Sequence, residues 1–166
     1  MTHLGPNSAL QWLPAMGLPE GVLAGVTQRY GGHSQGDFGA EPKLRPGLGR
    51  TQVRDAPEGG GFNLGDHVGD DPRHVELNRQ LLRTLVPDLP SDPVWLQQVH
   101  GVAVLEADRY QNRHQTYELR PKADASISLK PGVVCAVLTA DCLPMLLSVV
   151  DCATDQPVAV AAIHAG

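Results

Sequence analysis

The chain of 166 residues contains little cysteine and little positive charge. Its three cysteines, Cys135, Cys142 and Cys152, are an odd number in a chain of ordinary length and do not predict a disulfide framework. Their thiols therefore remain available for a metal ion or for catalysis. Thirteen Lys and Arg against 18 Asp and Glu give a net charge of −5. Without a basic field to hold a phosphate backbone, nucleic-acid binding is not expected.

The N-terminal segment also lacks positive charge, because no Lys or Arg precedes Arg29. A secretory signal needs a charged flank, so we interpret the start as mature sequence and expect a cytoplasmic protein. Residues 131–150 carry Asp141 as their only charge, which raises the possibility of a membrane span. Pro144 and the many valines favour two buried strands separated by a polar break, and we expect no membrane partner.

Glycine and proline are plentiful, with 18 and 14 residues, and are concentrated in the first 65 positions. The length fits a single domain spanning residues 1–166. Residues 35–61 combine Gly and Pro with charges of both signs and show almost no apolar periodicity. This composition predicts a long mobile surface loop, which we interpret as an insertion rather than an active-site flap.

One helix is predicted from a clear start signal. The Asp71 side chain can accept hydrogen bonds from the first free N–H groups, and Pro72 loses no bond in the first turn. Pro87 ends the element. The apolar residues that follow the start fall near one face: Val75, Leu82, Leu85 and Val86.

The remaining elements are expected to be strands. A first strand covers residues 21–30 and ends in a turn at Gly31 and Gly32. Six β-rich runs follow the helix: residues 94–100, 102–107, 123–129, 133–140, 143–150 and 157–165. Together they predict an α+β fold of mixed strands with helices outside. Because the chain stops directly after an apolar strand, we expect that it is truncated at its C-terminus.

Three possible metal ligands follow apolar strands: His100, Cys142 and His164. Two imidazoles and one thiolate match the ligand number of a catalytic zinc site whose fourth position is left to water or substrate. The spacings of 42 and 22 residues form no recognised signature. The same residues also suit nucleophilic catalysis, in which Cys142 attacks and His164 or His100 takes its proton. Both interpretations stay open on the residues alone.

Two further residues are candidates for a role at such a site. Asp141 could orient an imidazole, bind a substrate hydroxyl or simply hydrogen-bond a turn amide. Arg29 lies next to a double-glycine turn whose amides could hold an anion, although an Arg that ends a strand is more often solvated. Residues 62–71 resemble the polar loop that leads into a helix.

The other two cysteines have simpler interpretations. Cys135 alternates with Val133 and Val137, which favours packing in the core. Cys152 follows Asp151 in a polar connection and is expected to be exposed.

Six ordered blocks resemble the laccase-domain or YfiH-type family, whose members are labelled polyphenol oxidase, purine nucleoside phosphorylase and peptidoglycan editing factor. The resemblance runs from about Gly21 to Gly166 and is interrupted by residues 35–61. The blocks are Thr-Gln-Arg-Tyr-Gly-Gly-His-Ser at 27–34, Asn-Leu-Gly through Val-Gly-Asp-Asp-Pro to Asn-Arg within 63–79, Gln-Gln-Val-His-Gly at 97–101, Ala-Asp-Ala at 123–125, Thr-Ala-Asp-Cys-Leu-Pro at 139–144 and Ile-His-Ala-Gly at 163–166.

This resemblance implies a zinc ion bound by His100, Cys142 and His164. It also implies layered mixed sheets flanked by helices, a fold related to that of a bacterial toxin deamidase. The family is described as splitting adenosine, inosine and methylthioadenosine with phosphate and as deaminating adenosine. Zinc would then position phosphate or activate water, Arg29 would contact the anion, and Asp141 is a candidate proton donor. Copper is discounted, since three ligands to one ion do not make the multi-copper cluster of a laccase.

The sequence departs from the family in two places. The family continues past the His-Ala-Gly block with a Trp-Arg-Gly block, and it lacks the insertion at 35–61. Two alternatives therefore stand beside the zinc enzyme. One is a metal-free Cys/His hydrolase or deamidase acting on cell-wall precursors, and the other is an inactive, truncated binding protein. Metal analysis would separate the first alternative from a zinc enzyme.

Overall fold

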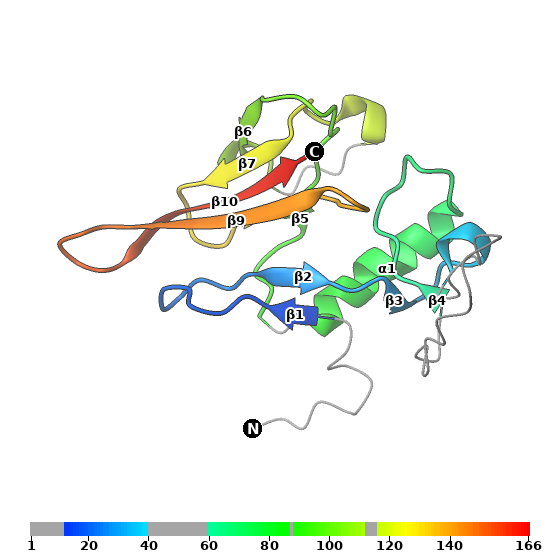
Figure 1. Ribbon diagram of the computed structural model, residues 1–166, viewed down its shortest axis with the longest axis horizontal. Coiled ribbons are helices and arrows are strands. Elements are labelled where there is room, and N and C mark those ends of the chain that lie inside the picture. Colours follow the sequence, from blue (N-terminus) through cyan, green and yellow to red (C-terminus); the bar gives the residue numbers. More distant parts are fainter. Residues whose placement is uncertain (1–11, 40–59, 87, 112–115) are drawn as a thin grey trace, which may run out of the picture. The chain divides into compact units, whose positions relative to one another are not determined.

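The computed structural model describes residues 12–39, 60–86, 88–111 and 116–166. The chain divides into two compact units. Unit 1 comprises Met1–Pro14 and Gly25–Pro87, and unit 2 comprises Ala15–Ala24 and Asp88–Gly166. The described residues form several small sheets and one α-helix (Figure 1). The predicted α+β class is confirmed.

Unit 1 contains two short antiparallel strand pairs. β1 (Trp12–Pro14) pairs with β2 (Gly25–Thr27), and β3 (Tyr30–Gly32) pairs with β4 (Gly60–Gly61). The single strand predicted over 21–30, with a turn at the two glycines, is therefore wrong in its extent. A side chain at Gly32 would put its Cβ 2.4 Å from the Asn78 Oδ1 atom and 2.5 Å from the Gly61 carbonyl oxygen. The glycine thus serves close packing of a strand rather than a turn.

The predicted insertion loop is described only at its two ends. A short 3₁₀ helix, η1, covers Gly36–Phe38, and β4 lies at the other end of the predicted segment. Residues 40–59 lie outside the described residues, and the insertion stays a prediction.

Helix α1 (Pro72–Leu85) begins and ends as the sequence predicts. Asp71 caps it, since its carboxylate accepts from the Arg73 backbone N–H at 2.9 Å, and Pro72 occupies the first turn. The N–H of Val86 bonds to the Leu82 carbonyl oxygen and closes the last turn. The predicted apolar residues are buried, and Asn78 is buried among them.

The helix cap gives a prediction about acid stability. The side chain and backbone N–H of Arg73 hold the pKa of Asp71 at about 2, below its ordinary 3.8. A carboxyl whose pKa is lower in the folded state stabilises the fold above its unfolded pKa and loses that contribution as the pH falls through its folded pKa. Circular dichroism at 222 nm should therefore show helix loss between about pH 4 and pH 2. Asp71→Asn should weaken that dependence, whereas Glu76→Gln on the exposed face should leave it intact.

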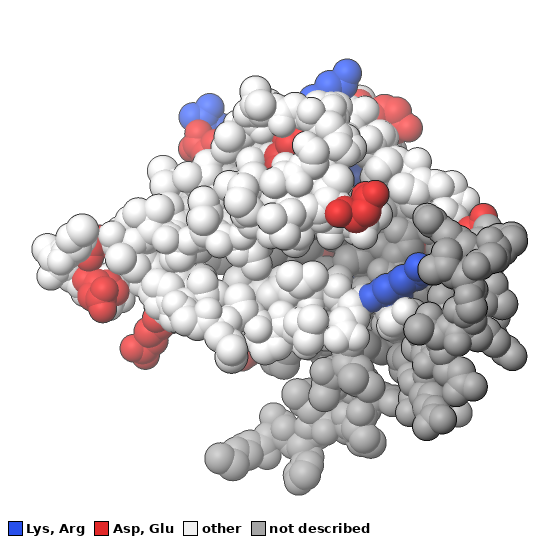
Figure 2. Space-filling model, viewed as in Figure 1, with Lys and Arg blue, Asp and Glu red and all other residues white. Residues whose placement is uncertain are grey.

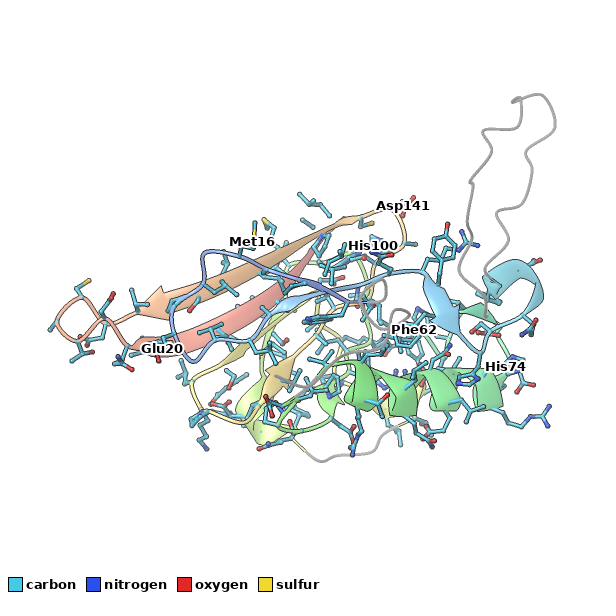
Figure 3. All side chains as sticks on the ribbon, turned by 90° about the horizontal axis from the view of Figure 1, so that it is seen from below. Met16, Glu20, Phe62, His74, His100 and Asp141 are labelled. Atoms are coloured by element: carbon cyan, nitrogen blue, oxygen red, sulfur yellow. The ribbon has the colours of Figure 1, made fainter. Side chains whose placement is uncertain are left out.

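A buried polar network holds the loop that enters α1. The Ser34 hydroxyl donates to Asp70 at 2.6 Å, and the Asn63 side-chain amide donates to the same carboxylate oxygen at 2.9 Å. Asn63 also accepts from the Gly65 backbone N–H at 2.9 Å, and Asn78 donates to Ser34 at 2.9 Å. The predicted helix-entry role of residues 62–71 is confirmed. His74, which is labelled in Figure 3, lies in the first turns of this helix.

Unit 2 is built on a four-stranded mixed sheet in the order β6-β7-β10-β9. β6 is parallel to β7, whereas β7 and β9 run antiparallel to β10. A second pair, β5 with β8, is parallel, and the 3₁₀ helices η2 and η3 lie between β6 and β7 in the chain. The bounds are β5 Pro93–Val94, β6 Val104–Glu106, η2 Ala107–Arg109, η3 Tyr117–Leu119, β7 Ala125–Ser128, β8 Val134–Cys135, β9 Leu143–Val150 and β10 Pro157–Ala165.

The two long strands match their predictions, but two predicted strands are mostly wrong. After β5, residues 95–100 form no strand and make one isolated bridge, at Gln97. The backbone N–H groups of residues 99–101 bond to the Asp124 side chain instead of to a neighbouring strand. The segment after β8 also leaves the sheet, and there the backbone of Leu138 bonds to the Gln98 side chain. In both places the backbone groups bond to a side chain where a strand would bond to a neighbouring strand.

Strand β9 lies at one end of the four-stranded sheet and exposes every second side chain. Leu143, Met145, Leu147 and Val149 are 40–65% exposed. Charge is sparse along this hairpin on the visible face, and acidic side chains appear at its tip (Figure 2). Residues 131–150 thus hold two strands, as predicted, but neither strand is fully buried. Among the described residues no helix combines the length and apolarity needed to cross a membrane.

Candidate metal centre

The register of unit 2 brings two of the predicted ligands together. In the antiparallel pair of β9 and β10, Leu143 lies opposite Ala165 and Pro144 opposite His164. Cys142, directly before β9, is therefore carried next to His164 near the end of β10. Sequence spacing alone could not indicate this, because the contact depends on the register of the hairpin.

His100 completes the cluster from a separate loop. The possible ligand atoms of His100, Cys142 and His164 all lie within 4.8 Å of one another. The Cys142 Sγ atom is 3.9 Å from the His100 Nε2 atom, and the two imidazole centroids are 4.8 Å apart at an interplanar angle of 75°. All three residues belong to unit 2, so the cluster lies within one compact part of the chain.

The cluster fits one metal ion with nitrogen and sulfur ligands. Zinc binds such atoms at about 2.0–2.3 Å, which puts neighbouring ligand atoms of a tetrahedron roughly 3.3–3.8 Å apart. A small closure of the present arrangement reaches those separations. His164 is buried, Cys142 half-buried and His100 exposed, so the cluster opens to solvent on one side. That opening can accept a water molecule or a substrate as the fourth ligand.

A buried carboxylate that the sequence analysis did not single out, Asp124, supports both imidazoles. It precedes β7, is 2% exposed, and accepts from the His164 Nδ1 atom at 3.1 Å. It also accepts from the backbone N–H groups of Val99, His100 and Gly101 at 3.2, 2.9 and 2.7 Å. Burial alone would raise the pKa of Asp124, but these hydrogen bonds, that of Gly101 foremost, hold it below its ordinary value.

The His100 loop has a backbone that few residues adopt. His100 has φ = +57°, in the left-handed region that non-glycine residues enter at a cost of roughly 1–2 kcal/mol. The bonds to Asp124 fix this turn, and the Gln98 side chain ties it to the segment that leads to Cys142. Gln98 donates to the Leu138 carbonyl oxygen at 2.8 Å and accepts from the Leu138 N–H at 2.7 Å.

Gly166 closes one side of the cluster. A Cβ atom at this position would lie 2.7 Å from the Cys142 Sγ atom and 3.0 Å from both imidazole rings. A side chain at this position would require the Cys142 sulfur and the imidazole rings to move, which gives a steric reason for glycine in the His-Ala-Gly block.

The other predicted site residues lie in different surroundings. Asp141 is exposed and is labelled in Figure 3. Its Oδ1 atom is 3.8 Å from the Cys142 Sγ atom. Arg29 belongs to unit 1, is exposed, and donates to the Gly39 carbonyl oxygen at 3.4 Å. The glycines beside it form part of β3, so the predicted double-glycine turn for an anion is wrong.

The remaining cysteines occupy the places that the sequence predicts. Cys135 lies in β8 and packs against the cluster of Val94, Ala107 and Val133. Burial raises the pKa of its thiol, which makes it a poor nucleophile. Cys152 is exposed in the connection between β9 and β10.

Sequence reasoning missed Asp124 and Gln98 as parts of the site. Ala-Asp-Ala at 123–125 stands out only as one block of the family resemblance, and nothing in its spacing links it to a histidine. Its role follows from a sheet register in which Ile163 lies opposite Ala125, and the His164 N–H bonds to the Asp124 carbonyl oxygen at 2.8 Å. Gln98 lies two positions before His100, and that proximity was the only local signal.

Comparison with known proteins gives one consistent family. Residues 23–166 match the family model described as multi-copper polyphenol oxidoreductase laccase. The chain is 40% identical over 156 residues to the purine nucleoside phosphorylase YfiH of Shigella flexneri, covering 93% of this chain and 50% of that protein. It is 42% identical to a purine nucleoside phosphorylase of Pseudomonas aeruginosa, covering 93% of this chain and 49% of that protein.

Solved structures agree. A Neisseria meningitidis protein is similar with a TM-score of 0.65 and 34% identity, covering 94% of this chain and 50% of that one. YlmD from Geobacillus stearothermophilus is similar with a TM-score of 0.66 and 28% identity, covering 95% and 50%. The chain thus spans about half the length of the relatives it matches. The predicted resemblance is confirmed, and the chain belongs to the laccase-domain family that includes the YfiH proteins.

Proposed function

We propose that this chain carries the zinc centre of a purine nucleoside phosphorylase that also deaminates adenosine. The observation that carries the proposal is the convergence of His100, Cys142 and His164 within 4.8 Å in one unit. The names of the relatives, which are purine nucleoside phosphorylases, support the substrate class. Purine nucleosides and phosphate are therefore the proposed small-molecule partners.

The donor set supports zinc over a copper cluster. Two imidazoles and a thiolate hold one ion, whereas laccase chemistry needs several copper ions. Within the described part of the chain, no other group of three or more metal-ligating side chains comes this close together. The polyphenol oxidase label of the family therefore has no matching site among these residues.

Each proposed reaction balances in the bonds that form and break. In phosphorolysis a phosphate oxygen bonds to C1′ of the ribose, the bond from C1′ to the base breaks, and the base leaves with the electron pair and takes a proton. In deamination water adds to the purine ring and ammonia leaves. A zinc ion held by His100, Cys142 and His164 would supply a Lewis acid for an oxygen of phosphate or water and would lower the pKa of that water.

The predicted site residues have separate proposed roles. His164 is held in place by Asp124, and His100 and Cys142 supply the remaining ligands on the open side. The exposed carboxyl of Asp141, next to Cys142, is the proposed group that moves a proton to or from the leaving base. Arg29, which belongs to unit 1, is proposed to contact an anion through its guanidinium.

The test uses the 166-residue chain loaded with zinc and incubated with adenosine, with and without phosphate. We expect adenine and ribose 1-phosphate only when phosphate is present, and inosine in both cases, with both activities lost after chelation and restored by zinc. A chain that holds one zinc ion but forms neither product would contradict the proposal. Full activity after chelation would instead favour the metal-free Cys/His hydrolase, since that mechanism needs only the thiol and an imidazole.

A further inference from the structure

We propose that Asp124 is the positioning residue of the metal centre, which fixes the ring nitrogen of His164 and the backbone of His100 at once. This inference rests on the proposed metal centre. It goes further by assigning a role to a carboxylate that lies outside the ligand set.

Each of the two carboxylate oxygens of Asp124 accepts two hydrogen bonds. Oδ1 accepts from the His164 Nδ1 atom and the His100 N–H, and Oδ2 accepts from the Val99 and Gly101 N–H groups. Since the carboxylate only accepts hydrogen bonds, it requires the proton of a neutral His164 to lie on Nδ1. The Nε2 lone pair is then left free for the metal. Partners of this kind orient ligating imidazoles in many metal sites.

The same carboxylate holds the other imidazole through the main chain. Three consecutive N–H groups can point at one side chain only when the loop curves around it. This curvature requires the left-handed backbone of His100, which is strained for a residue other than glycine. Val99 and Gly101 are exposed, so without Asp124 their N–H groups would bond to water and the loop could relax. Loss of the carboxylate would therefore release His100 from its place opposite Cys142.

Asp124→Asn separates these effects, because an amide offers one acceptor and one donor group. If its oxygen takes the Oδ2 place, the NH₂ group faces His164 Nδ1 and favours the tautomer that blocks Nε2. If its oxygen takes the Oδ1 place, the NH₂ group faces two backbone N–H donors and the loop is lost. Either arrangement weakens metal binding, and we expect a 10–100-fold loss of zinc affinity.

Asp108→Asn is the matched control. Asp108 lies in the same unit, is half-buried, and accepts from the Ser128 hydroxyl and the Leu129 N–H. Neither of these two bonds involves a residue of the metal cluster. Zinc affinity, measured by competition with a chromophoric chelator, should stay within about twofold of wild type in this variant.

A second measurement needs no variant. Nitrogen-15 NMR of the metal-free wild type, at a pH where imidazole is neutral, should show His164 protonated on Nδ1 and slow exchange of the Val99, His100 and Gly101 amide protons. Protonation on Nε2, or equal zinc affinity of wild type and Asp124→Asn, would overturn the inference. A wild-type chain that binds no zinc would overturn the proposed function instead, so the two failures are distinguishable.

Discussion

Replacing Cys142 with alanine is expected to remove zinc from the purified protein. The variant loses the only sulfur ligand of a three-residue set. For zinc sites with four protein ligands, the total free energy of zinc binding is about 10–16 kcal/mol. The loss of one such ligand should lower the affinity on the order of a hundredfold or more. Metal content measured by mass spectrometry should fall from about one equivalent per chain to near zero.

The other two cysteines supply matched controls for this prediction. Cys152→Ala changes an exposed residue in the β9–β10 connection, and Cys135→Ala changes a thiol packed in the core. Both variants should retain the wild-type amount of zinc, although Cys135→Ala should be less stable. An undiminished zinc content in Cys142→Ala would mean that the imidazoles do not share an ion with this sulfur.

Asn78→Leu is expected to destabilise unit 1 by about 3–5 kcal/mol. Asn78 is completely buried on α1, where its Oδ1 atom accepts from the His33 N–H at 2.7 Å and its amide donates to the Asn63 carbonyl oxygen at 2.8 Å. Leucine has similar size but leaves these groups unpaired in the interior. The free energy of unfolding should be measured with urea and circular dichroism at 222 nm, which follows the helix.

A nearby exposed residue controls for helix propensity. Gln80 lies exposed on α1, and its side-chain amide donates to the exposed Glu76 at 2.9 Å. Gln80→Leu should change the free energy of unfolding by less than about 0.5 kcal/mol. If Asn78→Leu behaves like Gln80→Leu, the buried network does not hold the loop that enters α1.

The sequence allows the elements with local signals to be predicted. Helix α1 carries its cap, its apolar face and its closing proline within a few turns of chain, and the hairpin of β9 and β10 shows long apolar runs. Short strands such as β5 and β8 were overestimated, because side chains of Gln98 and Asp124 take backbone bonds that a sheet would otherwise make. Those competing side chains lie 23 to 40 residues away and leave no periodic signal.

The candidate site was likewise predictable only in the residues that carry a local signal. The residue types of His100, Cys142 and His164 suggested a metal, and their place at strand ends suggested a shared edge. Their support was not predictable, because Asp124 reaches His164 only through the pairing of β7 with β10. Candidate metal ligands can therefore be recognised from the local sequence. The side chains that orient those ligands cannot, because their positions depend on the register of distant strands.

The route of the chain has a practical consequence. Unit 2 includes Ala15–Ala24, which connects β1 to β2 of unit 1, so the polypeptide passes between the units at residues 14–15, 24–25 and 87–88. A single proteolytic cut or a gene fragment starting at Asp88 would deliver unit 2 without one of its own pieces. Recovering that unit in isolation calls for a circularly permuted or stitched gene that restores the missing segment.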